Sequence, residues 1–189
     1  LNELEQLNLR KNTLIIFASD NGAAIQAPIK ILNCNAGFKG RKGTLYEGGI
    51  RVPFIVNQPG MVPIQTLDNL IYFPDMMPTL AALAKGTKHL PKQINGINIL
   101  PLFYGKQVDT DNRLLYWEFP GKQRAARKGD WKCVTIHPNQ PLELYNLKED
   151  PEETNNLAKK YPRRVKEFDE EMQRMHIPTP NWPQPGEQF

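Results

Sequence analysis

Residues 13–22 read TLIIFASDNG, a nearly continuous apolar run that ends abruptly in small and polar residues. The run is short and rich in β-branched side chains, which predicts a strand buried on both faces of a parallel sheet. Asp20, Asn21 and Gly22 follow it directly. Because ligands of open α/β sheets bind beyond the carboxyl ends of the strands, this position favours a binding site.

The sequence around this run predicts further elements of an α/β fold. Four leucines between positions 1 and 9 have near-helical spacing, and residues 53–56 form a second apolar run typical of a buried strand. Residues 74–85 predict a helix, with a proline near its start and a glycine after its end. Residues 20–50 have no sustained period, and so long an irregular segment is uncommon unless it serves a site.

The second half of the chain has a different pattern of apolar and turn residues. Short strand-like pieces alternate with turn residues and predict a small antiparallel sheet, at 114–119, 123–127, 131–137 and 142–145. Residues 158–175 have the apolar spacing of a helix that lies on this sheet. We therefore expect an α/β fold in three segments: 1–105 with part of a mixed, mainly parallel sheet and flanking helices, 106–176 as a small α+β subdomain, and 177–189 as an extended proline-rich tail.

Composition limits the classes of function. The 189 residues are 40% hydrophobic and 23% charged, which suits a globular domain or a large piece of one. Although the net charge is +4, basic and acidic residues are interleaved, so we expect no nucleic-acid partner. No apolar stretch approaches the roughly 20 residues of a membrane-spanning helix. Cys34 and Cys133 lack metal-type spacing and can be free thiols or a disulfide.

Asp20 and Asn21 have the chemistry of a metal site. A carboxylate beside an amide carbonyl offers the hard oxygen ligands that suit Ca²⁺ or Mg²⁺. Gly22 lets the backbone turn away, so that both side chains can converge on one ion. Taken alone, however, these three residues are more typical of a simple turn that ends a strand.

Residues 38–53 read FKGRKGTLYEGGIRVP and contain four glycines, which imply tight backbone paths. Lys42 lies between two of these glycines and can direct a compact cation at an anionic oxygen. This chemistry suits a sulfate or phosphate ester. A solvated basic loop is the alternative that composition leaves open.

Several motifs, in one order, resemble the sulfatase family of the alkaline-phosphatase superfamily. They are Ser19-Asp20-Asn21-Gly22, the pattern Lys-Gly-x-x-x-Glu-Gly-Gly-x-Arg-Val-Pro at 42–53, the stretch 73–80, Gly129-Asp130-Trp131-Lys132, the stretch 143–151, and Asn155-Asn156-Leu157-Ala158. Ordered independent motifs are more specific than any single short motif. The resemblance spans roughly residues 1–160.

The resemblance implies roles for individual residues. Asp20 and Asn21 would coordinate a divalent cation, most often calcium in this family, and Lys42 would contact the sulfate group. The loop that carries them would be supported by Gly22, Glu47, Gly48, Gly49 and Arg51. Glu47 and Arg51 would hold the loop by pairing or backbone bonds, or face the substrate. Asp75 and Pro78 match positions whose role is structural.

The resemblance also implies a nucleophile that this chain lacks. Such sulfatases attack with a formylglycine made from Cys or Ser in a Cys/Ser-x-Pro/Ala-x-Arg motif, and neither Cys34 nor Cys133 has that context. We expect the motif upstream in the same polypeptide, so that this chain is a C-terminal portion, inactive alone. Because a hard cation takes about 6–8 ligands, Asp20 and Asn21 should bind it weakly by themselves. The three histidines, at 89, 137 and 176, are expected to be structural or on the surface.

The substrate would be a sulfate ester. A sulfated carbohydrate suits the basic and aromatic residues of the loops, while aryl and steroid sulfates stay open. Phe38, Tyr46, Trp117 and Arg124 are candidates for the pocket walls. The family resemblance implies an exported, periplasmic or lysosomal protein. Two alternatives stay open: a related phosphatase or phosphonate hydrolase, and a nonenzymatic module that binds sulfated glycans through Trp117, Trp131, Arg124 and Arg127.

Overall fold

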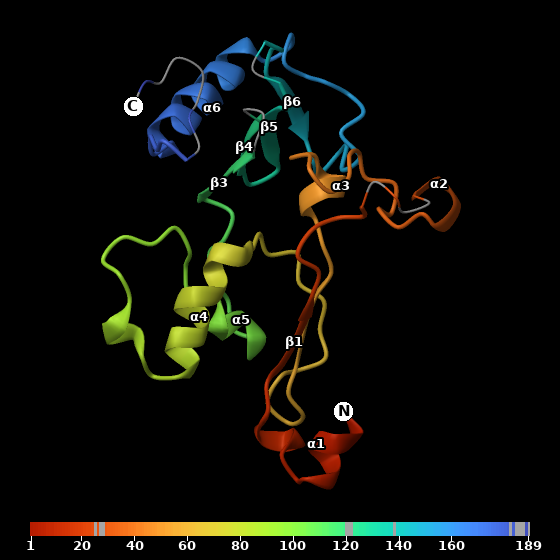
Figure 1. Cartoon of the computed structure of the whole chain (residues 1–189), viewed down its shortest axis with the longest axis vertical. Helices are drawn as coiled ribbons and strands as arrows, with labels where there is room; N and C mark the ends of the chain where they lie inside the picture. The colour runs from red at the N-terminus through yellow and green to blue at the C-terminus, as the bar shows by residue number, and fades with distance from the viewer. Residues whose placement is uncertain are drawn as a thin grey trace. The chain divides into compact units, whose positions relative to one another are not determined.

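The structure is a computed structural model and describes residues 1–24, 26, 29–119, 123–137, 139–181, 183 and 188 (Figure 1). It contains two compact units, each made from two pieces of the chain. The first comprises Leu1–Ala18 and Pro53–Asn112, and the second comprises Ser19–Val52 and Arg113–Phe189.

The first unit contains a two-stranded sheet. After α1 (Asn2–Gln6) and η1 (Arg10–Asn12), β1 (Ile15–Ala18) pairs with β2 (Phe54–Asn57). The pair is antiparallel, which corrects the expectation of a parallel sheet for these strands. Within this chain the strands are not buried on both faces, because Phe17 and Ile55 lie opposite each other and are 61% and 57% exposed. An apolar run indicates that a strand tends to be buried, but it does not predict whether the neighbouring strand is parallel or antiparallel.

Short helices complete the first unit. They are η2 (Phe73–Asp75), α4 (Met76–Leu83), η3 (Thr87–His89) and α5 (Leu100–Phe103), so the helix predicted at 74–85 is confirmed. A buried cluster of Ile99, Leu102 and Phe103 packs against Phe54 and Val56 on the inner face of β2. Asp75 is fully buried and accepts hydrogen bonds from the backbone N–H groups of Tyr72 (3.0 Å) and Ile97 (2.9 Å).

The second unit is built around a four-stranded antiparallel sheet in the order β3-β4-β5-β6. The strands are β3 (Leu114–Phe119), β4 (Gln123–Lys128), β5 (Trp131–Thr135) and β6 (Glu143–Asn146). One face packs on α6 (Pro162–Met175) through Cys133, Phe168 and Met172, among others. The predicted sheet and helix are confirmed, and so is the α/β fold class. The helix begins later than residue 158 because Pro162 occupies its first turn, where a missing N–H costs nothing.

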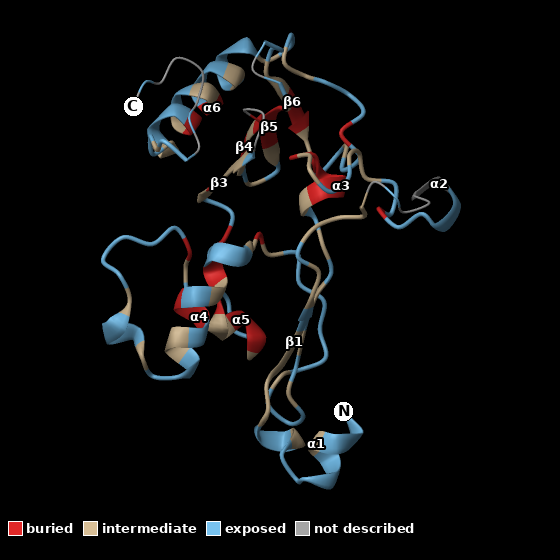
Figure 2. Ribbon diagram, in the orientation of Figure 1, coloured by how far each residue is buried: buried red, intermediate tan, exposed pale blue. Residues whose placement is uncertain are grey.

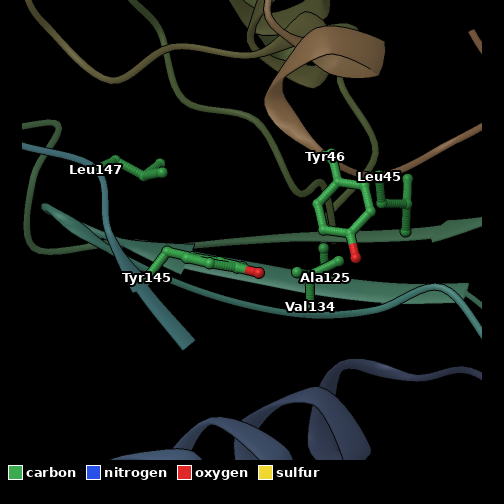
Figure 3. Packing of buried hydrophobic residues seen from close by; sticks show 6 residues of the cluster. All are labelled: Leu45, Tyr46, Ala125, Val134, Tyr145 and Leu147. Carbon is green, nitrogen blue, oxygen red and sulfur yellow. The ribbon is translucent and has the colours of Figure 1, made fainter. Parts of the chain in front are cut away.

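The opposite face of this sheet is covered by the glycine-rich loop. Leu45 and Tyr46 project from the loop onto Ala125 and Val134, as Figure 3 shows. The glycine-rich loop, residues 38–52, contains α3 (Glu47–Ile50), and α2 (Ile29–Leu32) precedes it along the chain. In Figure 2, α3 is among the most buried parts of the unit. Residues 19–52 therefore pack with the C-terminal sheet in this chain. The division into 1–105, 106–176 and 177–189 stays a prediction.

Both cysteines are free thiols, Cys34 exposed and Cys133 buried. Burial raises the pKa of Cys133 to about 12, so this thiol stays protonated and acts as a packing residue. Within the described ranges, no helix is long and apolar enough to cross a membrane. The prediction of an extended tail falls partly on residues 182, 184–187 and 189, which lie outside the described residues.

Candidate functional site

The turn at Asp20 and Asn21 is tied to α3 by its backbone. The Gly22 N–H donates to the Gly49 carbonyl at 2.9 Å, and the Ser19 hydroxyl donates to the Asn21 carbonyl at 2.9 Å. The Asp20 side chain is exposed. A Cβ atom at Gly22 would lie 1.8 Å from the Gly48 carbonyl oxygen, so the turn requires glycine for the close approach of two backbones.

The glycine-rich loop folds back on itself in the same way. The Gly48 N–H donates to the Lys39 carbonyl at 2.7 Å, and a Cβ atom at Gly48 would lie 2.6 Å from that oxygen. At Gly49 a Cβ atom would lie 2.1 Å from the Thr44 carbonyl oxygen. The paired glycines let α3 sit against the loop that precedes it, and this contact sets the path of the backbone on both sides of Lys42.

Lys42 is joined to the Asp20 segment by a direct backbone contact. Its N–H donates to the Ala23 carbonyl at 3.0 Å, while its side chain is exposed. Asn35 is 6% exposed and links the segment after Asp20 to the segment before Lys42. Its Oδ1 accepts from the Ala23 N–H at 3.2 Å, and its Nδ2 donates to the Gly40 carbonyl at 2.6 Å. The structure therefore brings the backbones of both predicted site segments together. The sequence did not predict these contacts of Asn35, because a single asparagine in a loop forms no recognisable motif.

Glu47 joins the glycine-rich loop to the sheet through its side chain. Its side chain is 3% exposed, and its Oε1 accepts a charged hydrogen bond from Lys132 at 2.9 Å. Its Oε2 lies 3.8 Å from an Arg51 guanidinium nitrogen and 3.7 Å from one of Arg127. Glu47 and Arg51 thus lie within ion-pair distance of each other, and Glu47 is directed into the sheet; their role as supports of a site loop stays a prediction.

Glu153 completes this buried network. Its Oε1 lies 2.9 Å from the Lys132 ammonium, and its Oε2 accepts from the Glu47 backbone N–H at 2.7 Å. Burial raises the pKa of Glu153 although the Lys132 charge opposes the rise. The sequence indicated Lys132 only as part of a family motif and did not indicate Glu153, because the pairing of charges so distant along the chain has no local pattern.

A second polar cluster holds Tyr46 in the core. The Tyr46 and Tyr145 hydroxyls donate to one Glu143 oxygen at 2.7 and 2.6 Å, and the Lys39 ammonium lies 4.0 Å from the centre of the Tyr46 ring. Burial acts to raise the pKa of Glu143, but the two tyrosine hydrogen bonds and the Lys39 charge outweigh it, so the pKa is lowered. Tyr46, at 6% exposure, is a packing residue within this chain and not an open pocket wall.

The residues proposed for a glycan-binding surface have partners inside the chain. Arg124 lies 3.4 Å from Asp169, Arg127 pairs with Glu47, and the Arg164 guanidinium lies 4.3 Å from the centre of the Trp131 ring. These contacts disfavour the sheet as a free binding face. Of the histidines, His89 and His137 are exposed, while His176 Nδ1 lies 2.6 Å from Glu118 and joins the end of α6 to β3.

The donor set at Asp20 and Asn21 fits part of a calcium site. Their carboxylate and amide oxygens are ligands that calcium prefers, but they are two of the about 6–8 that it takes. Across the described part of the chain, no three His, Cys, Asp or Glu side chains are grouped as a metal site. An ion at this position would need further oxygen ligands besides these two.

Residues 38–177 match the family described as N-sulphoglucosamine sulphohydrolase, C-terminal. The chain belongs to this sulfatase family. It is 32% identical over 187 residues to a sulfatase of Formosa agariphila, covering 86% of this chain and 33% of that protein. It is 30% identical over 192 residues to an N-acetylgalactosamine-6-O-sulfatase of Bacteroides thetaiotaomicron, covering 90% of this chain and 37% of that protein.

A solved structure supports the same relationship. It comes from work on the metabolism of multiple glycosaminoglycans by Bacteroides thetaiotaomicron and matches with a TM-score of 0.80 at 30% identity. The match covers 92% of this chain and 40% of that one. The sulfatase chain thus spans between a third and two fifths of these three proteins, and the expectation of a C-terminal portion of a sulfatase is confirmed.

Proposed function

We propose that the protein containing this chain hydrolyses sulfate esters and that Asp20, Asn21 and Lys42 form one wall of its active site. The observation that carries the proposal is the hydrogen bond from the Lys42 N–H to the Ala23 carbonyl at 3.0 Å. This bond, together with that from Gly22 to Gly49, holds two family motifs in one loop layer of the second unit. Membership of the sulfatase family supports the reaction class.

Each residue has a separate chemical task in this proposal. Asp20 and Asn21 hold a divalent cation, calcium, which when bound polarises a sulfate oxygen. Lys42 directs its ammonium at another sulfate oxygen and stabilises the negative charge that develops during transfer. The nucleophile, a formylglycine, belongs to upstream sequence of the same polypeptide. Glu47 and Arg51 hold the loop so that Lys42 is presented in one position.

A sulfated carbohydrate is the proposed substrate class. The N-acetylgalactosamine-6-O-sulfatase among the relatives and the glycosaminoglycan context of the solved structure support this choice. An exported, periplasmic or lysosomal location belongs to the same proposal. A phosphatase of the same superfamily is the alternative, because a cation and a lysine serve either anion.

The full-length protein provides the test, with an aryl sulfate, N-acetylgalactosamine 6-sulfate and the matching phosphate esters as substrates. Lys42→Ala should lower kcat/KM for sulfate esters by about 10²–10³-fold, the usual cost of one charge-stabilising donor. Asp20→Ala should also weaken calcium binding in calorimetry. Lys159→Ala, at an exposed position, is the matched control and should change neither quantity. Unchanged activity of Lys42→Ala would overturn the proposal, and faster phosphate turnover would support the alternative.

A further inference from the structure

Gln123 makes an unusual pair of contacts for a side chain at the start of a strand. It is the first residue of β4 and is 8% exposed. Its Nε2 donates to the Gly43 carbonyl at 2.9 Å, and its Oε1 accepts from the Leu45 N–H at 3.2 Å. The amide therefore pairs with two main-chain groups of the glycine-rich loop, as a neighbouring strand would.

The two contacts enclose the turn that carries Lys42. Gly43 has a φ of 90°, a conformation that suits glycine, so the chain bends immediately after the lysine. Phe119, the register partner of Gln123 on β3, lies 4.0 Å from the position a Gly43 Cβ atom would take. The last residue of β3 and the first residue of β4 thus lie directly against this bend.

Lys42 is consequently held from both sides while its side chain stays exposed. Before the side chain, the Lys42 N–H donates to the Ala23 carbonyl. After it, the carbonyl of the following residue, Gly43, accepts from Gln123. A lysine side chain is long and flexible, so its Cα position limits where the ammonium can reach. A fixed backbone lowers the entropy lost when the ammonium takes one position beside an anion.

We propose that Gln123 is a positioning residue for Lys42 and sets the reach of its ammonium to the sulfate group. Gln123 does not touch the substrate; it acts through Gly43 and Leu45. The inference rests on the proposed function, in which Lys42 contacts the sulfate. It adds a residue from the C-terminal sheet that none of the family motifs quoted above includes.

A double-mutant cycle in the full-length protein, with an aryl sulfate as substrate, tests the proposal. Gln123→Met keeps the length of the side chain and removes both hydrogen bonds. In the wild-type background it should lower kcat/KM by about 10-fold and raise the inhibition constant of inorganic sulfate. In the Lys42→Ala background it should change kcat/KM by less than about 2-fold, because residues that act as a unit are not additive.

The outcomes separate this inference from the proposed function. An equal loss in both backgrounds would overturn the positioning role and leave the sulfatase proposal intact. Unchanged activity of Lys42→Ala would overturn the sulfate contact itself, and the inference with it. If Lys42→Ala leaves no measurable rate, Lys42→Arg takes its place in the cycle.

Two further variants control for folding. Gln173→Met makes the same chemical change on α6, where the exposed side chain donates to Asp169 at 3.0 Å, and it should leave activity unchanged. If Gln123→Met lowers the apparent melting temperature sharply, Gln123→Asn enters the same cycle. Asparagine is one methylene shorter and cannot span both partners, so the same non-additivity is expected, and full additivity would again overturn the proposal.

Discussion

Lys132 is a fully buried cation that lies between two buried carboxylates, Glu47 and Glu153. The three side chains come from separate segments: the glycine-rich loop, β5 and the connection after β6. A buried ion pair adds little stability over an apolar pair of the same shape, but the loss of one partner leaves a charge without compensation. The network therefore constrains the path of the loop more than it adds to net stability.

Lys132→Met should destabilise the full-length protein by about 3–5 kcal/mol, because it leaves the Glu47 and Glu153 carboxylates buried without their cation. Arg51→Ala should cost less than about 1 kcal/mol, since the Arg51 side chain is 50% exposed and lies 3.8 Å from Glu47. Urea unfolding of both variants measures the difference. Equal small losses for the two would contradict a structural role for the Lys132 network.

Glu143 gives a pH dependence whose sign follows from its pKa. Its folded-state pKa lies below the value of 4.5 of an unperturbed glutamate, so its stabilising contribution is present above that pH. The contribution is lost as the pH falls through the lowered folded-state pKa. Unfolding free energies measured between about pH 6 and pH 3 should fall less steeply for Glu143→Gln than for the wild type. Parallel curves would show that Tyr46, Tyr145 and Lys39 do not stabilise this carboxylate.

At the scale of elements, the four-stranded sheet separates two unlike layers. Cys133 of β5 faces α6, while its neighbour Val134 faces Leu45 and Tyr46 of the glycine-rich loop. Alternate residues of one strand therefore support the helix and the candidate site loop.

Met172→Ala should destabilise the protein by about 2–5 kcal/mol, because Met172 is fully buried where α6 meets the sheet. Lys166→Ala, on the exposed side of the same helix, should change the free energy of unfolding by less than about 0.5 kcal/mol. Chemical denaturation compares the two. A loss below 1 kcal/mol for Met172→Ala would mean that α6 contributes about as little as a surface element.

At the scale of the whole molecule, the proposed active site is incomplete within this chain. In the proposed function Asp20 and Asn21 supply only two oxygen ligands, and neither Cys34 nor Cys133 stands in a formylglycine motif. The isolated chain should therefore show no aryl-sulfate hydrolysis and only weak calcium binding, whereas the full-length protein should show both. Parallel rate assays and calcium titrations check this. A robust rate from the isolated chain would show that its own residues suffice for catalysis.

Local patterns in the sequence were enough for the family, for β3 to β6 and for α6. The alternation of apolar and polar residues, helical spacing and turn residues each involve only a few neighbouring positions, so they predict these elements directly. The ordered motifs likewise pointed to Asp20, Asn21 and Lys42 without any knowledge of the fold.

Packing alone revealed how these parts meet. The antiparallel pairing of β1 and β2 depends on which strands are neighbours, and no apolar run reports that. Gln123 meets Gly43 across 80 positions of the chain, and Lys132 meets Glu47 across 85. Such contacts follow from the shape and charge of surfaces that exist only after folding, so no local pattern marks Gln123 and Lys132 as contacts of the glycine-rich loop.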